Sequence, residues 1–306
     1  MSHSPEDDLL SSVLSTYQLR ASVYAHPRFC GVWQFGATGH KRSTFHLVGE
    51  GRCWLHLRDG AAPQALEGGD LVVFPHDAWH MLAGTPELHG DDDRLEMDGE
   101  GPFTTLVCGH FEFLVGDKNP ILDALPEVIV VRQQDAGRHL ELIGRLLMEE
   151  AEAAGPGSRT VLDKLADALF VMVVRHYINR SADQRGLLAA LADPRLRRAL
   201  AVMHLESAKG WTLAALAQEA GMSRASFAQR FAELVGTTPI DYLTRWRMIQ
   251  AELLLRNPQV SVASTAERVG YETEAAFRKA FKRVHGVGPG AIRRWFRQKV
   301  GGADPG

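Results

Sequence analysis

The residues best suited to chemistry lie near the carboxyl end, where amide and guanidinium groups could meet the edges of DNA bases. Gln229 can form two hydrogen bonds with adenine, and Arg278 and Lys279 carry donors that suit guanine. Glu274 could accept from cytosine, although an acidic residue in the first turn of a helix more often complements the helix dipole. The candidate DNA contacts are Ser223, Arg224, Ala225, Gln229, Arg230, Thr273, Glu274, Arg278, Lys279 and Arg283.

Positive side chains around these candidates could bind the phosphate backbone, which positions a protein without specifying sequence. They are Arg224, Arg245, Arg247, Lys282, Arg283, Arg293 and Arg294. Arg247 lies inside an expected long helix, so a packed structural role is an equally good interpretation for it.

The amino-terminal half contains a second group of residues, with the chemistry of metal ligands. His46, His80 and Cys108 could converge on zinc or another divalent ion, with His40 as a fourth ligand. The alternative is that these side chains line a small-molecule pocket or contact nearby tryptophans. Residue type alone leaves both interpretations open. The candidate effector-binding residues are Trp33, His46, Trp54, Pro75, His80 and Cys108.

The DNA-contact candidates fall on the second helix of a helix-turn-helix pattern that occurs twice. Ala217 and Gly221 in the first copy correspond to Ala266 and Gly270 in the second, and the second glycine follows the first by 49 positions. Two helices that meet across a short turn need a small side chain at their closest approach and a residue that accepts positive φ. The repeated spacing therefore predicts two helix-turn-helix units.

Each second helix also has a marked start and a marked buried face. Ser223 and Thr273 can accept hydrogen bonds from the free amides at the helix start. Aromatic residues four positions apart share one helical face, which would be buried while the other face stays free. These aromatic pairs are Phe227 with Phe231 and Phe277 with Phe281.

Between the two copies, residues 239–257 predict one long helix. Its apolar residues fall mostly on one face, and Pro239 and Pro258 stand at its two ends, where helix termini commonly carry proline. With a three-helix unit at each end, two recognition helices would project in the same direction. They could enter successive segments of the major groove about one DNA turn apart.

Further residues at fixed positions complete the carboxyl-terminal pattern. They are Met222-Ser223-Arg224, Phe231, Val235-Gly236, Pro239, Tyr242-Leu243, Arg247, Val269-Gly270-Tyr271, Ala276-Phe277, Ala280-Phe281-Lys282-Arg283, Gly286 and Pro289. With them, the carboxyl-terminal segment closely resembles the DNA-binding domain of the AraC family. The resemblance implies a bacterial regulator that binds double-stranded promoter DNA, with RNA polymerase as a candidate partner. Three residues depart from the family pattern: Thr265 replaces a buried Ile, His285 an aromatic residue, and Gly288 a Ser or Thr.

Upstream, short apolar runs separated by Gly, Pro and Asp predict an antiparallel barrel or sandwich. The expected strands are Ser22–Ala25, Gly31–Phe35, Thr44–Val48, Cys53–Leu57, Asp70–Phe74 and Phe103–Cys108. The run from Gly69 to His80 resembles the second cupin motif. The first cupin motif is degraded, with Thr44 where a ligating Glu normally stands. This half is similar to the cupin-like sensor domains found ahead of AraC-type DNA-binding domains, which implies an effector or ion site.

Helical periodicity follows from Asp135 onward, and a short amphipathic helix is expected at Leu9–Tyr17. The helix that begins near Val161 is apolar around much of its circumference, so we expect a homodimer seam there. The alternative is that these helices cover the barrel of their own chain. Gln184 to Leu191 is the expected linker.

The predicted fold class is multidomain α+β. It comprises a cupin-like barrel over residues 1–134, a helical dimerisation and linker region over 135–190, and an all-α DNA-binding domain over 191–306.

Composition limits the class of protein. From Ala190 onward there are 18 basic and 10 acidic residues, against 16 and 27 before it, which suits a phosphate-binding module on an acidic body. No apolar run is long enough to span a membrane, and the acidic amino terminus argues against a signal peptide. Three scattered cysteines fit reduced thiols in the cytoplasm.

The leading hypothesis is a cytoplasmic transcription regulator controlled by an effector. The alternative is a metal-dependent cupin enzyme with an appended helical interaction module, which Thr44 disfavours because it removes a carboxylate ligand. Neither a phosphate-binding loop nor a nucleophilic serine elbow occurs in the sequence. The effector, the operator and the choice between activation and repression are not encoded in any recognisable pattern.

Overall fold

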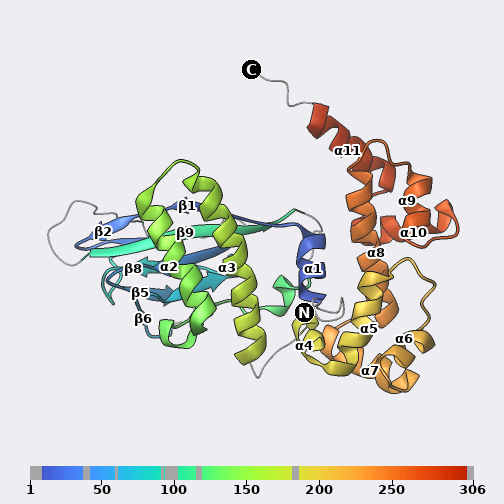
Figure 1. Cartoon of the computed structure of the whole chain (residues 1–306), viewed down its shortest axis with the longest axis horizontal. Coiled ribbons are helices and arrows are strands. Elements are labelled where there is room, and N and C mark those ends of the chain that lie inside the picture. The colour runs from blue at the N-terminus through green and yellow to red at the C-terminus, as the bar shows by residue number, and fades with distance from the viewer. Residues whose placement is uncertain are drawn as a thin grey trace. The chain divides into compact units, whose positions relative to one another are not determined.

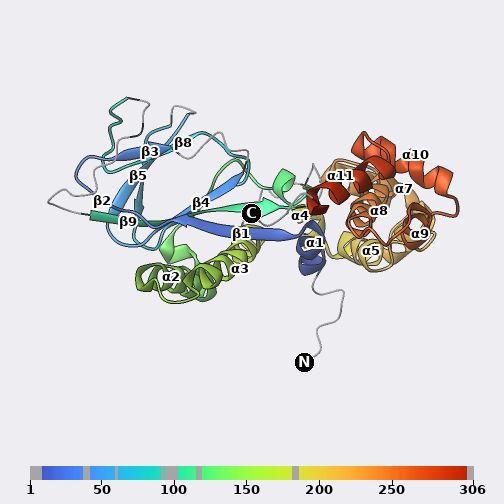
Figure 2. The same cartoon turned by 90° about the horizontal axis from the view of Figure 1, so that it is seen from above.

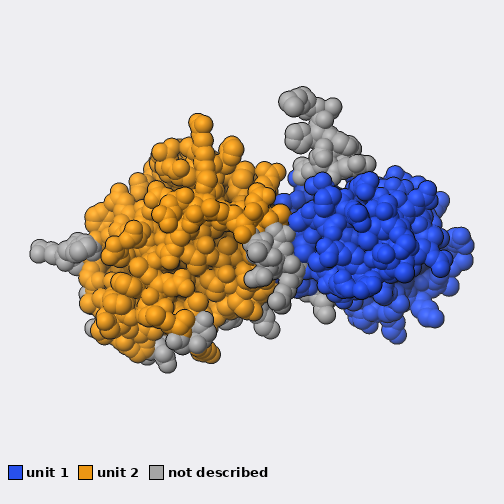
Figure 3. Space-filling view, turned by 90° about the horizontal axis from the view of Figure 1, so that it is seen from below, with its two compact units in different colours: residues 1–18, 113–124, 183–306 blue, residues 19–112, 125–182 orange. Residues whose placement is uncertain are grey.

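The computed structural model describes residues 9–36, 42–58, 61–90, 93, 103–114, 119–180 and 186–301. The chain forms two compact units, coloured separately in Figure 3. The sheet unit comprises Leu19–Glu112 and Leu125–Ala182, and the helical unit comprises Met1–Gln18, Phe113–Ala124 and Asp183–Gly306. This grouping differs from the predicted three-part division, because most of the helical segment after residue 135 belongs with the sheets.

The described part of the sheet unit contains two sheets with antiparallel pairing, as the predicted cupin-like fold requires. The larger sheet has the order β1 (Leu19–Ala25), β9 (Phe103–Phe113), β4 (Ser43–Val48), β7 (Leu71–Phe74) and β10 (Ile129–Val131), with β2 (Arg28–Cys30) paired to β9. The smaller sheet has the order β3 (Gln34–Gly36), β8 (His80–Ala83), β5 (Arg52–Leu57) and β6 (Gln64–Glu67).

One expected strand is wrong. Only the last two residues of the run Gly31–Phe35 lie in a strand, β3. Residues 31–33 form a break between β2 and β3, because Gly31 adopts a positive φ of 68° that an extended strand does not accommodate. The short strands β6, β8 and β10 had no counterpart in the sequence prediction. The cluster of Asp, Glu and Gly from Gly84 to Gly101 also predicts a loop, and most of that segment lies outside the described residues.

Strand β4 directs side chains both into the barrel and toward the helices outside it, because successive side chains of a strand point to opposite faces. His46 contacts Cys108 and Phe74 between the sheets. Phe45 stacks on Phe111 of β9 with 4.9 Å between ring centroids, on the opposite face. Leu47 shares that outer face. One strand therefore contributes both to the interior and to the surface on which helices pack.

Two helices, α2 (Gly137–Ala153) and α3 (Ser158–Arg180), cover this outer face (Figures 1 and 2). Phe170 of α3 packs on Phe111 with 4.7 Å between ring centroids. Asp167 accepts a 2.7 Å hydrogen bond from the backbone amide of Ala21, which lies in β1 at the end of the sheet order. The buried face of α3 therefore covers the barrel of its own chain, which was the alternative to a dimer seam.

The helical unit begins with α1 (Leu9–Tyr17), whose predicted bounds are confirmed, and the 3-10 helix η2 (Leu122–Ala124) also belongs to it. Tyr17 packs near Trp246 with ring centroids 6.2 Å apart. The expected linker is wrong over its described part, because residues 186–191 form most of a helix that is largely buried. The remaining helices are α4 (Gly186–Ala192), α5 (Pro194–Leu205), α6 (Leu213–Glu219), α7 (Arg224–Val235), α8 (Pro239–Leu255), α9 (Val262–Arg268), α10 (Glu274–His285) and α11 (Pro289–Gly301).

Among the described residues, no helix has both the length and the apolar character needed to cross a bilayer.

Candidate nucleic-acid interface and core histidine cluster

The two helix-turn-helix units have the same dimensions. Helices α6 and α9 are each 7 residues long, and α7 and α10 are each 12 residues long. Gly221 and Gly270 take the positive φ values expected at the turns, 62° and 81°. Ala217 and Ala266 are 1% and 2% exposed, as expected for small residues where the helices approach. The predicted repeat is therefore present in the structure.

The starts and anchors of the recognition helices α7 and α10 also match the prediction. The Ser223 hydroxyl accepts a hydrogen bond from the amide of Ser226, and the Thr273 hydroxyl accepts one from Ala276, both at 3.2 Å. The anchoring rings are fully buried, which fixes one face of each helix against α8 and leaves the opposite face in solvent. These rings are Phe227, Phe231, Phe277 and Phe281.

Helix α8 carries one unit at each end (Figure 1). Phe231 of α7 meets Tyr242 near the start of α8, with ring centroids 5.6 Å apart. Phe277 and Phe281 of α10 share a buried cluster with Leu255 at its end. A single rigid helix therefore holds both recognition helices.

On α7, the predicted DNA contacts Arg224, Ala225 and Gln229 are exposed. The Gln229 amide donates to Glu233 over 2.8 Å, one turn further along the same surface. Arg230 is held differently, because its guanidinium lies 3.3 Å from the Asp193 carboxylate. DNA contact by Arg230 would have to compete with this ion pair.

Asp193 is the amino-terminal cap of α5, and its carboxylate is stabilised in the charged form. Burial raises the pKa of Asp193, but hydrogen bonds from the amides of Leu196 and Arg195 and from the Arg230 side chain outweigh it and lower the pKa overall. No local sequence pattern indicates this link between α5 and α7.

On α10, Lys279 is exposed and forms no ion pair with any described residue. Arg278 is paired with Glu274 at 2.6 Å, one turn earlier on the helix. Glu274 is therefore engaged at the helix start, in keeping with the structural interpretation of that residue. Arg283 is exposed and lies 3.8 Å from Asp241 of α8.

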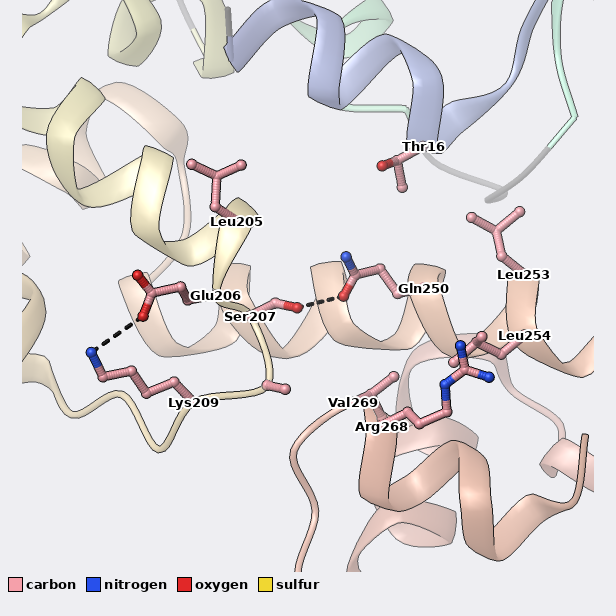
Figure 4. Close-up of a pocket in the computed structure, with 11 residues that line it drawn as sticks. Thr16, Leu205, Glu206, Ser207, Lys209, Gln250, Leu253, Leu254, Arg268 and Val269 are labelled. Carbon is pink, nitrogen blue, oxygen red and sulfur yellow. Dashed lines mark hydrogen bonds and ion pairs between the residues drawn. The ribbon is translucent and has the colours of Figure 1, made fainter. Parts of the chain in front are cut away.

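A strut joins the two helix-turn-helix units on one side of α8. We use this word for Glu206–Lys209, the first part of the α5–α6 connection. The Arg247 guanidinium donates to the carbonyls of Ser207 and Lys209 at 2.6 and 2.7 Å. The Ser207 hydroxyl donates to Gln250 at 2.6 Å (Figure 4). Arg247 therefore has the packed structural role, because two of its nitrogens are bonded to these carbonyls.

The turn of the second unit closes on this strut. A Cβ atom at Gly270 would lie 2.2 Å from the carbonyl oxygen of Ala208, so no side chain fits there. At Gly221, the equivalent Cβ would meet only the end of the Arg198 side chain, at 3.4 Å. The two glycines share a backbone conformation, but only Gly270 is also required by a close backbone contact.

The departures from the AraC pattern are accommodated. Thr265 is fully buried and its hydroxyl donates to the carbonyl of Ser261 at 2.8 Å, which satisfies its polar group. His285 packs on Phe281 with 4.3 Å between ring centroids and bonds to the Met248 carbonyl at 3.2 Å. A Cβ at Gly288 would meet no atom of the described residues within 4 Å apart from its chain neighbours.

In the sheet unit, the residues predicted to converge do so. His46 Nδ1 lies 3.1 Å from Cys108 Sγ, and His46 Nε2 lies 3.0 Å from His80 Nε2. His80 Nδ1 lies 2.9 Å from the Ala78 carbonyl oxygen. His46, His80 and Cys108, which we call the histidine cluster, are at most 1% exposed.

The proton positions in the histidine cluster follow from its acceptors. The Ala78 carbonyl can only accept, so His80 donates from Nδ1 and its Nε2 must accept from His46 Nε2. His46 Nδ1 then accepts from the Cys108 thiol. Burial lowers the pKa of His46 well below its usual value and that of His80 to about 4, while burial raises the pKa of Cys108. All three groups are neutral near pH 7.

This arrangement does not direct three ligands at one ion. His80 and Cys108 lie at opposite nitrogens of the His46 ring, so a single ion could not bind all three as they stand. No group of three or more potential ligands with metal-binding geometry occurs in the part of the chain that the structure describes. His40 lies outside the described residues. A metal in the barrel stays a prediction that this geometry does not support.

The other predicted effector residues divide between the interior and the outside of the barrel. Trp33 is 2% exposed and stacks on Phe29, with ring centroids 4.5 Å apart. Trp54 does not join the histidine cluster, because its neighbours Cys53 and Leu55 point into the core and strand alternation directs Trp54 outward.

Pro75 is buried beside β7, and its carbonyl accepts a 2.7 Å hydrogen bond from Ser43. The sequence prediction missed Phe74, whose ring stacks on His80 with 3.5 Å between centroids.

Comparison with known proteins gives a consistent result along the chain. Residues 8–179 match the family described as Cupin, and residues 216–295 match the family described as helix-turn-helix domain. The chain is 30% identical to an uncharacterized HTH-type transcriptional regulator of Haemophilus influenzae, over 94% of this chain and 98% of that protein. It is 32% identical to a putative AraC-like transcription regulator of Streptomyces lividans, over 95% of this chain and 98% of that protein.

A solved structure also matches part of the chain. It is described as the DNA-binding domain of AdpA in complex with a target DNA. The identity is 32%, the match covers 35% of this chain and 96% of that chain, and the TM-score is 0.33.

Proposed function

Because this chain belongs to the AraC-like family of DNA-binding transcription regulators, we propose that an effector bound by its sheet unit controls how its helical unit engages promoter DNA. The observation that carries the proposal is the pair of matched recognition helices held on α8 with their polar faces in solvent. Control requires that the effector bind a DNA-competent arrangement and an incompetent one with different affinity.

Sequence would be read by three exposed side chains. Gln229 on α7 suits adenine, and Arg278 and Lys279 on α10 suit guanine. Arg224 and Arg283 would hold phosphates and set the position of the unit on the duplex. Contact by Gln229 or Arg278 requires each side chain to leave its partner one turn away on the same helix, which costs little at an exposed site.

Two glutamine substitutions test this assignment. Gln229→Ala should weaken binding to the cognate promoter at least tenfold while leaving binding to unrelated DNA unchanged, because the amide contributes only base contacts. The matched control is Gln218→Ala, an exposed glutamine on α6, which should leave both affinities unchanged. Gel shifts over a range of salt concentrations supply the measurement. Salt-independent binding would contradict a phosphate-contacting protein.

We also propose that the protein is a homodimer. Leu142 and Leu146 of α2 stand one turn apart and are 36% and 49% exposed, and Val161 of α3 is 43% exposed. A second copy could cover this pair through an isologous contact. Leu146→Asp should then lower the mass measured by sedimentation, whereas Leu205→Asp, at an equally exposed leucine of the helical unit, should not.

The proposal includes no catalytic step, and it places the protein in the cytoplasm, where promoter DNA is accessible. RNA polymerase is the proposed partner during transcription. The barrel residues Trp33, His46, Pro75, His80 and Cys108 stay candidates for the effector site.

A further inference from the structure

A groove outside the barrel has the features of a ligand site. It has a volume of about 340 Å³ and lies between α2 and the outer face of the larger sheet, within the sheet unit. Ligand pockets start at about this size. By contrast, the histidine cluster is fully buried and closely packed. A small molecule could reach the groove without opening the barrel.

The floor of the groove is apolar. Leu47, Leu140 and Leu169 are buried along it. Helix α2 has a glycine where it passes over the sheet: a Cβ at Gly144 would lie 3.6 Å from Leu47, which is an ordinary contact. An alanine would therefore fit there, and glycine weakens a helix interior relative to alanine. The absence of a side chain at Gly144 keeps the groove open.

A flexible side chain lies across part of this space. A Cβ at Gly49 would be 1.9 Å from the terminal methyl of Met148, so Met148 occupies the position that a side chain at Gly49 would take. Methionine is unbranched and changes conformation at low cost. Displacement of Met148 would enlarge the groove without moving the backbone.

The charges around the groove select the ligand. Four glutamates line it against a single arginine, and none of the five forms an ion pair with another described residue. They are Glu50, Glu141, Glu149, Glu152 and Arg145. An anionic ligand would be repelled by this excess of carboxylates, whereas a cation would be attracted.

We propose that this groove binds a small organic cation with an apolar body, the apolar part on the leucine floor and the positive group among the glutamates. Leu142 and Leu146 do not line the groove, so a second copy bound to that pair would leave the ligand site on a separate face of α2. The assignment of this cation as the controlling effector rests on the proposed function, whereas its binding to the groove does not.

Calorimetry on the full-length protein tests the site with matched eight-carbon probes. Octyltrimethylammonium should bind with one molecule per chain and at least tenfold more tightly than octanoate or octanol. Gly144→Leu should fill the groove and weaken cation binding at least tenfold, with an unfolding temperature no lower than that of the parent protein. A double substitution, Glu149→Gln with Glu152→Gln, should reduce the preference for the cation over octanol. Glu127→Gln, an exposed glutamate elsewhere in the sheet unit, should not.

Several results would overturn the proposal. One is equal affinity for octanoate and the cation, and another is unchanged affinity of Gly144→Leu for the cation. A third is a changed mass of the Gly144→Leu protein in solution, which would show that the groove is a contact between chains. DNA binding by the same samples separates this question from the proposed function. DNA binding without cation binding would contradict the groove proposal alone. Cation binding without DNA binding would contradict the proposed regulator function alone.

Discussion

The contact between Gly270 and Ala208 yields a sharp prediction about how the two reading units are held together. Gly270→Ala and Gly221→Ala both place a β-carbon in the left-handed region, at φ values of 81° and 62°. That costs about 1–2 kcal/mol, of which about 0.4–1 kcal/mol is recovered because the unfolded chain loses freedom. Gly221→Ala should therefore destabilise the protein by about 1 kcal/mol.

Gly270→Ala has a second cost. Its β-carbon would lie 2.2 Å from the Ala208 carbonyl oxygen, and backbone must move to relieve this, whereas the Arg198 side chain near Gly221 can simply rotate. Overpacking of this kind adds about 1–3 kcal/mol. The movement would also strain the hydrogen bonds from Arg247 to Ser207 and Lys209.

Urea unfolding followed by far-ultraviolet circular dichroism measures the difference. An extra 2 kcal/mol lowers the midpoint by about 1 M if stability falls by about 2 kcal/mol per molar urea. We expect Gly270→Ala to unfold about that much earlier than Gly221→Ala. Equal midpoints for the two variants would show that the contact between the strut and the turn at Gly270 does not limit stability, which would refute the reasoning.

Further predictions concern single groups. Arg247→Lys should cost about 1.5–3 kcal/mol in unfolding free energy, because an ammonium cannot reproduce two guanidinium bonds to the strut, while Arg245→Lys on the exposed face should be neutral. Thr273→Ala should cost about 1 kcal/mol by removing the cap of α10, and a loss below 0.3 kcal/mol would contradict the cap. Gly144→Ala should stabilise the protein by about 0.5–1 kcal/mol, since the added methyl meets Leu47 at an ordinary distance; destabilisation would refute the open-groove geometry. Burial lowers the pKa of His204 to about 3, so the unfolded chain binds a proton at a higher pH than the folded chain. The free energy of unfolding should therefore fall by roughly 2 kcal/mol as the pH is lowered from about 7.5 to about 5. His204→Phe should remove that part of the pH dependence. Urea unfolding at both pH values measures it, and an unchanged difference in unfolding free energy between the two would contradict the role of His204.

Local patterns were sufficient to predict the helical unit. The spacing of Ala217 and Gly221, repeated at Ala266 and Gly270, depends on short-range requirements of a turn, and short-range requirements are visible in sequence. The role of Arg247 was undecided for the opposite reason. Its partners Ser207 and Lys209 lie about 40 positions away, and nothing local distinguishes a buried guanidinium from one that meets phosphate.

The sheet unit was predicted less completely. His46, His80 and Cys108 were expected together because motif resemblance placed them on inward-facing positions, and the structure joins them. Trp54 was misplaced because Cys53, Trp54 and Leu55 are all apolar, so alternation could not show which face was buried. The groove beneath α2 was not predicted at all, since it depends on the packing of Gly144 over a strand distant in sequence.

The most direct test of a protein that reads DNA with two matched helices is selection of bound duplexes from a random pool by the full-length protein. We predict two short conserved blocks centred about one helical turn, or 10–10.5 base pairs, apart. Gln229→Ala should degrade one block and Lys279→Ala the other. A single conserved block, or two blocks degraded together by either substitution, would contradict independent reading by α7 and α10.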